Sequence, residues 1–264
     1  MSFSPTRSLA AAAGLAMATA SLAACAPSSS AHGLAVVATT TQVCDYVTQI
    51  AARSADISLD KTDAAGKSSH VGAAADGAAL TMSLTCLLAP NASAHEHEMT
   101  PAQTSALAQA DVMAVSGVDL EHFLDDAVVS SGFKGRMIVT SGVLTAADID
   151  NPGTPDPEGA YTIDRGSERV DVAPWPFPPE EAGEEPEFRF DPHVWTSPKG
   201  ARVQVANLGA GLAAAAPDAA SSINAATASY LEEIDALDQW TAEAIATVPE
   251  GQRVLFTSHD AFGY

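Results

Sequence analysis

Positive charge is scarce in this chain of 264 residues. Lysine and arginine together number 12, against 33 aspartates and glutamates, and the formal net charge is −21. A chain of this kind has no basic patch that could neutralise phosphates, which argues against a nucleic-acid partner. The acidic surface is compatible with gathering cations, although solubility alone would account for it.

The most apolar run of the N-terminal region, Leu9–Ala24, is too short to span a membrane and has the composition of a secretory signal. It ends in Leu-Ala-Ala before Cys25, which resembles the signal of bacterial lipoproteins. We therefore expect residues 1–24 to be removed and residues 25–33 to form a tether. Lipidated Cys25 would then anchor the protein to the cell membrane, outside the cytoplasm. An ordinary cleaved signal is the alternative.

Cysteine is also rare. Cys44 and Cys86 are the two that remain after the lipidation candidate, and no Cys-x-x-Cys spacing accompanies them, which disfavours a cysteine zinc site. An oxidising compartment favours a disulfide between them. We expect this bridge to join the first helix to the second strand, with an unpaired, buried Cys86 as the alternative.

Hydrophobic periodicity in the first half predicts strands that alternate with helices. This alternation is typical of a parallel sheet with right-handed crossovers, so the predicted fold class is α/β. The small, polar residues 56–77 are expected to form a loop. The expected strands are 34–38, 80–88, 112–115 and 137–140, and the expected helices are 42–53, 101–110 and 120–130.

The second half breaks this pattern. Residues 148–189 are rich in proline, glycine, aspartate and glutamate, and we expect them to be an acidic mobile insertion in an N-terminal lobe that spans 34–197. Linking helices are expected over 198–248, the second long enough to act as a strut. A strand at 253–257 is expected to begin a second α/β lobe, of which residues 249–264 are only the start.

Three of the seven histidines lie in contexts that differ from those of the rest. His95 follows a strand and precedes a capped helix, His193 follows the insertion, and His259 follows the last strand. Ligands of open α/β sheets bind beyond the carboxyl ends of strands, and three neutral imidazoles make a plausible zinc site. Metal-bound histidines usually donate their other ring N–H to an oxygen, and Glu121 and Asp260 are candidates for this role.

Three motifs together resemble the metal-binding receptors of bacterial zinc and manganese ABC importers. They are Ala-His-Glu-His-Glu-Met-Thr-Pro around His95, Asp-Pro-His-Val-Trp around His193, and Ser-His-Asp-Ala-Phe-Gly-Tyr around His259. The resemblance implies a bilobal, non-catalytic receptor that passes a metal to the importer's permease. It makes these histidines the metal ligands and leaves unassigned the fourth, usually a carboxylate of the second lobe. His97 stands where the family usually has tyrosine and is a candidate additional ligand.

The resemblance also bears on the metal. Zinc receptors of this family tend to have histidine at the position of His259, and manganese receptors glutamate. Imidazole nitrogens suit zinc and hard carboxylate oxygens suit manganese, so we expect Zn(II), with Mn(II) as the alternative.

Two other functions stay open. One is surface adhesion, a role sometimes attributed to the same family. The other is a secreted zinc metallohydrolase, but the His-Glu-x-x-His motif is absent. The pair His95-x-His97 is also followed by Met99, where binuclear hydrolases carry aspartate.

Overall fold

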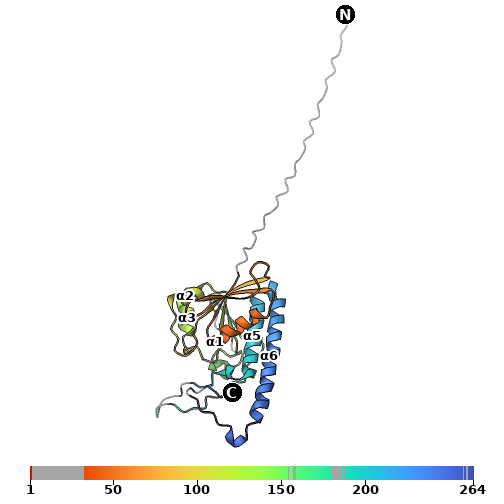
Figure 1. Cartoon of the computed structure of the whole chain (residues 1–264). Helices are drawn as coiled ribbons and strands as arrows, with labels where there is room; N and C mark the ends of the chain where they lie inside the picture. Colours follow the sequence, from red (N-terminus) through yellow and green to blue (C-terminus); the bar gives the residue numbers. More distant parts are fainter. Residues whose placement is uncertain are drawn as a thin grey trace. The chain divides into compact units, whose positions relative to one another are not determined.

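In the computed structural model, Gly33–Tyr264 folds into a twisted sheet with helices on both faces (Figure 1). The signal segment, Cys25 and Asp260 lie outside the described residues. Those described are 1, 33–153, 155–156, 159–179, 183, 186, 188–257, 259 and 261–264.

Seven strands form the sheet in the order β3-β2-β4-β1-β5-β6-β7. Every neighbouring pair is parallel except β2 with β3. The predicted α/β class with a mainly parallel sheet is therefore confirmed. The strands are β1 (Leu34–Ala38), β2 (Ile57–Thr62), β3 (Ser68–Gly72), β4 (Leu80–Cys86), β5 (Val112–Val115), β6 (Arg136–Val139) and β7 (Thr162–Asp164).

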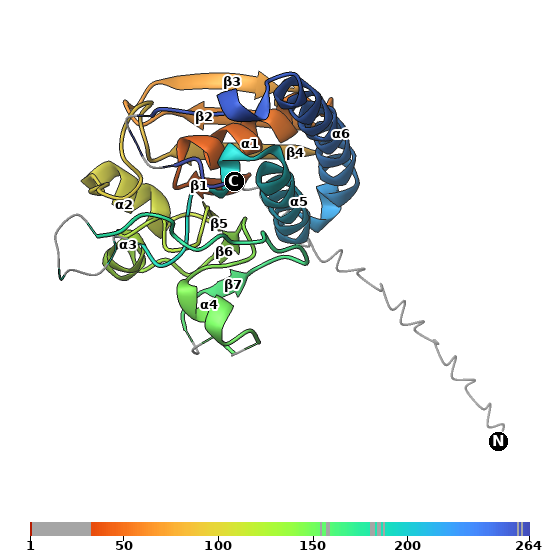
Figure 2. The ribbon, with the colours of Figure 1, turned by 90° about the horizontal axis from the view of Figure 1, so that it is seen from below.

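Alternate residues of the central strands face different helices, as the period of two along a strand requires. Val36 and Ala38 belong to the core beneath α1, α5 and α6, whereas Val37 packs with the core beneath α2 and α3. Figure 2 shows these helix groups on opposite sides of the sheet. The helices are α1 (Thr41–Ala52), α2 (Pro101–Ala108), α3 (Leu124–Ser131), α4 (Ala146–Asp150), α5 (Pro198–Ala215) and α6 (Ala220–Ala246).

Side chains fix both ends of the loop that carries His95. At its far end, Thr100 caps α2 by accepting from the backbone N–H of Gln103, whose side chain accepts in turn from the Thr100 N–H. The same Gln103 side chain donates to the carbonyl of Leu87 over 2.7 Å. At the near end, Cys86 of β4 forms a disulfide with Cys44 of α1, with Cα atoms 5.6 Å apart.

The structure corrects the expectation of a loop at 56–77. This segment forms the hairpin β2–β3 at one edge of the sheet. Asp63 shapes its turn by accepting from the backbone N–H groups of Ala65 and Lys67, and Gly66 adopts a φ of 81°. The residues of β3 are mostly exposed, so they lack the alternation of a half-buried strand.

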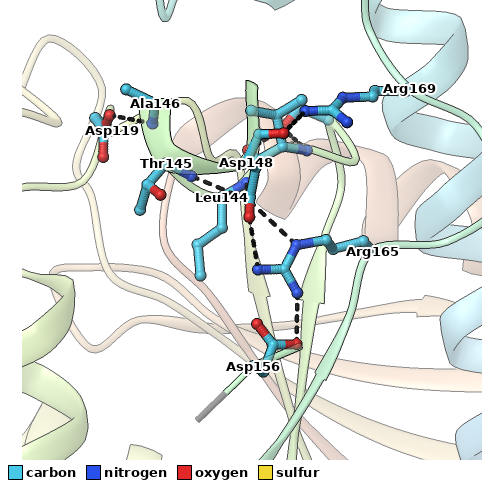
Figure 3. Close-up of polar contacts among 10 residues, drawn as sticks. Asp119, Leu144, Thr145, Ala146, Asp148, Asp156, Arg165 and Arg169 are labelled. Atoms are coloured by element: carbon cyan, nitrogen blue, oxygen red, sulfur yellow. Dashed lines mark hydrogen bonds and ion pairs between the residues drawn. The ribbon is translucent and has the colours of Figure 1, made fainter. Parts of the chain in front are cut away.

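The segment 148–189 also contains more structure than its composition predicts. Its strand β7 pairs with β6, and α4 begins just before it. Asp148 accepts from the backbone N–H of Leu144 and pairs with Arg165, which also pairs with Asp156 (Figure 3). Arg169 donates to the carbonyl of Asp148. The mobility expected of this segment stays a prediction.

The strand expected at 253–257 does not form. Val254, Leu255 and Phe256 are 66%, 69% and 92% exposed, because no strand of the described part of the chain lies beside them to pair with. The long helix is confirmed as α6, whose 27 residues span about 40 Å. Among the described residues, no helix combines the length and apolar character needed to cross a membrane.

Candidate metal centre

Three histidines far apart in the sequence meet at one end of the parallel strands. His95 lies in the loop after β4, His193 precedes the short 3₁₀ turn Val194–Thr196, and His259 lies beyond α6. One ring nitrogen of each lies within 4.8 Å of those of the other two. They line a cavity of about 540 Å³, together with residues of the β1–α1 turn and of the loop after β4. Such a donor set could hold one divalent cation.

The backbone of a strained turn orients His95. Its Nδ1 donates to the carbonyl of Leu120 over 3.3 Å, which leaves the Nε2 lone pair free. The turn before Leu120 is unusual, since Val118 and Asp119 have φ values of 59° and 54°, a region that β-branched residues rarely adopt. Burial and the neighbouring His193 lower the pKa of His95 to about 4, so the ring is neutral at pH 7.

Glu121 holds this turn in place. Its buried carboxylate accepts from the Thr39 hydroxyl over 2.6 Å and from the backbone N–H groups of Ser116 and Gly117. Burial raises its pKa, and these donors act against that shift. The expectation that Glu121 orients a ligand imidazole is therefore corrected, because its carboxylate is bonded to the turn and not to a histidine.

Asp191 is the residue that orients a histidine, although it is not among the residues predicted for this role. Its Oδ1 accepts from Nδ1 of His193 over 2.8 Å and from the His193 backbone N–H over 2.9 Å. Both residues are 1% exposed. Burial alone would raise the pKa of Asp191, but the hydrogen bonds from His193 hold it below its usual value. The Asp-Pro-His spacing was the available signal, since a carboxylate two residues before a histidine can reach its ring.

His259 is exposed, and its Nε2 lies 3.1 Å from Nε2 of His193. Because Nδ1 of His193 already donates to Asp191, its Nε2 presents a lone pair to His259. At this distance either the Nε2–H of His259 donates to that lone pair, or one cation binds both nitrogens.

An aromatic wall borders the histidines on one side. The ring of Phe188 lies 5.0 Å from that of His95, and Trp175 lies 5.1 Å from Phe188 and 6.1 Å from His193, measured between centroids. A backbone ladder brings these two residues together, since the Trp175 N–H donates to the carbonyl of Arg189. The wall removes water from one side of the site.

His97 does not join the three histidines. Its ring packs against Phe123 with centroids 4.9 Å apart, and its buried Nε2 has no hydrogen-bond partner among the described residues. His122 comes closer, 5.8 Å from the ring of His95 between centroids, but it contributes no nitrogen to the converging set. The role expected of Asp260 falls outside the described residues.

A family of metal-uptake proteins matches most of this chain. The model of ZnuA, described as "Zinc-uptake complex component A periplasmic", matches residues 74–264. The chain belongs to the ZnuA family. Members are metal-binding solute-binding proteins of ABC importers and are not enzymes, as predicted.

Curated relatives of this ZnuA-family chain are named for different metals. It is 29% identical to the manganese-binding lipoprotein MntA of Bacillus subtilis (strain 168), over 82% of this chain and 60% of MntA. It is 27% identical to the iron-binding protein YfeA of Yersinia pestis, over 66% of this chain and 46% of YfeA. The chain thus spans less than two thirds of the length of these relatives.

The fold agrees with the family. The structure of Zn(II)-bound AdcA from Streptococcus pneumoniae superimposes with a TM-score of 0.57 at 20% identity, covering 88% of this chain and 36% of that one. At this identity the likeness concerns the fold alone. It supports the parallel-dominated sheet and the long helix α6 of this ZnuA-family protein.

Proposed function

We propose that this protein captures zinc outside the cytoplasm and delivers it to the permease of an ABC importer. The observation that carries this proposal is the convergence of His95, His193 and His259, whose ring nitrogens lie within 4.8 Å of one another. Imidazole nitrogens suit zinc, which accepts tetrahedral sites of four ligands. Zinc is here the cargo, to be bound and then released, and not a resident cofactor.

The hydrogen bonds of the rings support a role for each in this proposal. His95 and His193 use Nδ1 to bond Leu120 and Asp191, so each binds the metal through Nε2. His259 also directs Nε2 toward the site. Three imidazoles leave one coordination position, for water or a carboxylate. The resemblance to bilobal receptors supports a carboxylate from a second lobe that closes on the metal.

Metal preference is the part of the proposal that most needs a test, because the relatives include proteins named for manganese and iron. The donor set of His259 and the other two imidazoles favours zinc. A carboxylate at that position would favour manganese. Copper exceeds zinc in the general affinity order, so the informative comparison is zinc against manganese.

The direct experiment measures zinc and manganese affinity of the full-length protein. We expect zinc to bind more tightly, and His95→Ala, His193→Ala and His259→Ala each to weaken zinc at least about 100-fold, more than the loss of a supporting residue. His259→Glu should narrow the preference for zinc. His70→Ala is the matched control, since His70 is exposed on β3 and bonded to Asp60. A preference of the unmodified protein for manganese would refute the assignment of zinc.

Delivery and anchoring need cellular tests. A strain without the gene should grow poorly in chelated medium, and added zinc, but not manganese, should restore its growth. The wild-type gene should complement this strain and the His193→Ala variant should not. Cys25→Ser should release the protein from the membrane fraction, and its retention there would contradict the lipid anchor.

A further inference from the structure

The hydroxyl of Tyr264 is inserted into a backbone ladder beside the candidate metal centre. The Asp191 N–H donates to the carbonyl of Ala173 over 2.9 Å. In an uninterrupted antiparallel pair, the Ala173 N–H would donate back to the carbonyl of Asp191. Here it donates to the Tyr264 hydroxyl over 3.2 Å, and that hydroxyl donates to the carbonyl of Asp191 over 2.6 Å. Tyr264 therefore bridges the two chains where their direct bond is missing.

This bridge joins the segments that carry two of the three histidines. Asp191 holds the ring and backbone of His193. Tyr264 is five residues beyond His259 in the sequence, and its ring packs against the cluster that contains Val118 and Val194. The His259 segment is thus attached at Tyr264 to the segment that positions His193.

Close packing at Gly263 shows how tightly the two segments meet. A Cβ atom at this position would lie 2.2 Å from Oδ2 of Asp191. Any side chain larger than that of glycine would therefore push the two segments apart. Burial raises the pKa of Tyr264 to about 12, so the hydroxyl keeps its proton and remains a donor at neutral pH.

We propose that Tyr264 is a positioning residue for metal capture, which holds His259 against His193 before the metal arrives. The inference rests on the proposed metal binding by the histidines. Its physical basis is preorganisation, since an exposed histidine on an untethered segment would lose conformational entropy on binding, and a tethered one has lost it already. Tyr264 itself touches no metal.

The test is a double-mutant cycle on the full-length protein, with zinc affinity measured by competition with a chelator. Tyr264→Phe keeps the ring and removes both hydrogen bonds, and we expect it to weaken zinc about tenfold. In a His259→Ala background the same substitution should not weaken zinc affinity any further. If the role of Tyr264 were purely structural, Tyr264→Phe would lower zinc affinity by the same factor with either His259 or alanine at position 259.

A second variant and a control sharpen the result. Gly263→Ala should also weaken zinc in the His259 background, because it separates the same segments. Tyr161→Phe removes a hydroxyl from a ring that packs on Phe133, away from the histidines, and should leave affinity unchanged. Unchanged affinity in Tyr264→Phe, or equal losses in both backgrounds, would overturn the inference. The proposed function fails separately, if the single alanine variants of the histidines retain zinc.

Discussion

The ring of Phe188 packs against the ring of His95, with centroids 5.0 Å apart. Phe188 is 5% exposed, although it belongs to the segment 148–189, whose composition predicts a mobile insertion. The segment therefore supplies a wall of the candidate site. This wall contributes to the burial that lowers the pKa of His95 to about 4.

Replacing Phe188 by leucine should weaken zinc binding about fivefold, which corresponds to the loss of one aromatic contact. The pKa of His95 should rise toward its ordinary value, because the smaller side chain admits water. Calorimetry and an NMR titration of the His95 ring measure the two effects. Phe177→Leu is the matched control, since Phe177 is 37% exposed and packs on Trp175. Equal effects of both variants would contradict a specific role for Phe188.

Asp191→Asn should weaken zinc about 10- to 100-fold, the usual effect of losing a carboxylate that supports a metal-bound histidine. The amide keeps the size of the side chain but removes the charge that holds Nδ1–H of His193. Zinc titration of the folded variant measures this effect. Asp218→Asn, at an exposed position, makes the same chemical change and should have no effect. An unchanged affinity in Asp191→Asn would mean that the backbone alone orients His193.

Removing the disulfide by the double change Cys44→Ala and Cys86→Ala should lower the free energy of unfolding by about 4 kcal/mol. The bridge closes a loop of 42 residues, and its loss frees the unfolded chain by about that amount. Urea unfolding with and without a reductant provides the measurement. Reductant should destabilise the wild-type protein and leave the double variant unchanged. Equal sensitivity of both proteins would show that the bridge is not formed.

The ion pairs of Figure 3 predict a dependence of stability on acid. Burial alone would raise the pKa of Asp148, but Arg165 and the backbone N–H of Leu144 hold it below its usual value. The charged carboxylate therefore stabilises the fold above about pH 4, the ordinary pKa of aspartate, and this contribution is lost as the pH falls through the lower pKa of the folded state.

Asp148→Asn should accordingly melt lower than the wild type at pH 7, by at most about 4 °C, because such pairs contribute about 1 kcal/mol or less. The difference should shrink as the pH falls toward about 3. Thermal melts of both proteins across this range test the prediction. Asp218→Asn, which disturbs none of these pairs, should follow the wild type throughout. A difference in melting temperature that grew as the pH fell would contradict the prediction.

The sequence predicts the central strands β4, β1, β5 and β6 but misses β2, β3 and β7, which lie toward the edges of the sheet. The strands Leu34–Ala38 and Val112–Val115 agree with the structure to the residue, because their apolar runs come from burial. The strands β3 and β7 lie at the two edges of the sheet and carry few buried side chains. Their pairing depends on neighbours distant in the sequence, which local patterns do not encode.

The same contrast applies to the candidate site. The motifs single out His95, His193 and His259, because each combines a metal-binding side chain with a loop position. Phe188 is identified only by its contacts in three dimensions, whereas the Asp-Pro-His spacing is a sequence signal for Asp191. The sequence singles out Glu121, but the partner predicted for it, a ligand imidazole, is wrong. Its carboxylate instead accepts from backbone N–H groups of the turn before it.

The wide spacing of the three histidines also constrains how the protein is made. His95 and His193 are separated by 98 residues, and His259 follows 66 residues later. Every contact among them therefore joins residues that are far apart in the sequence. A nascent chain still short of residue 259 presents at most two of these three imidazoles. The three-histidine site therefore cannot form until residue 259 has been synthesised, whatever has folded before it.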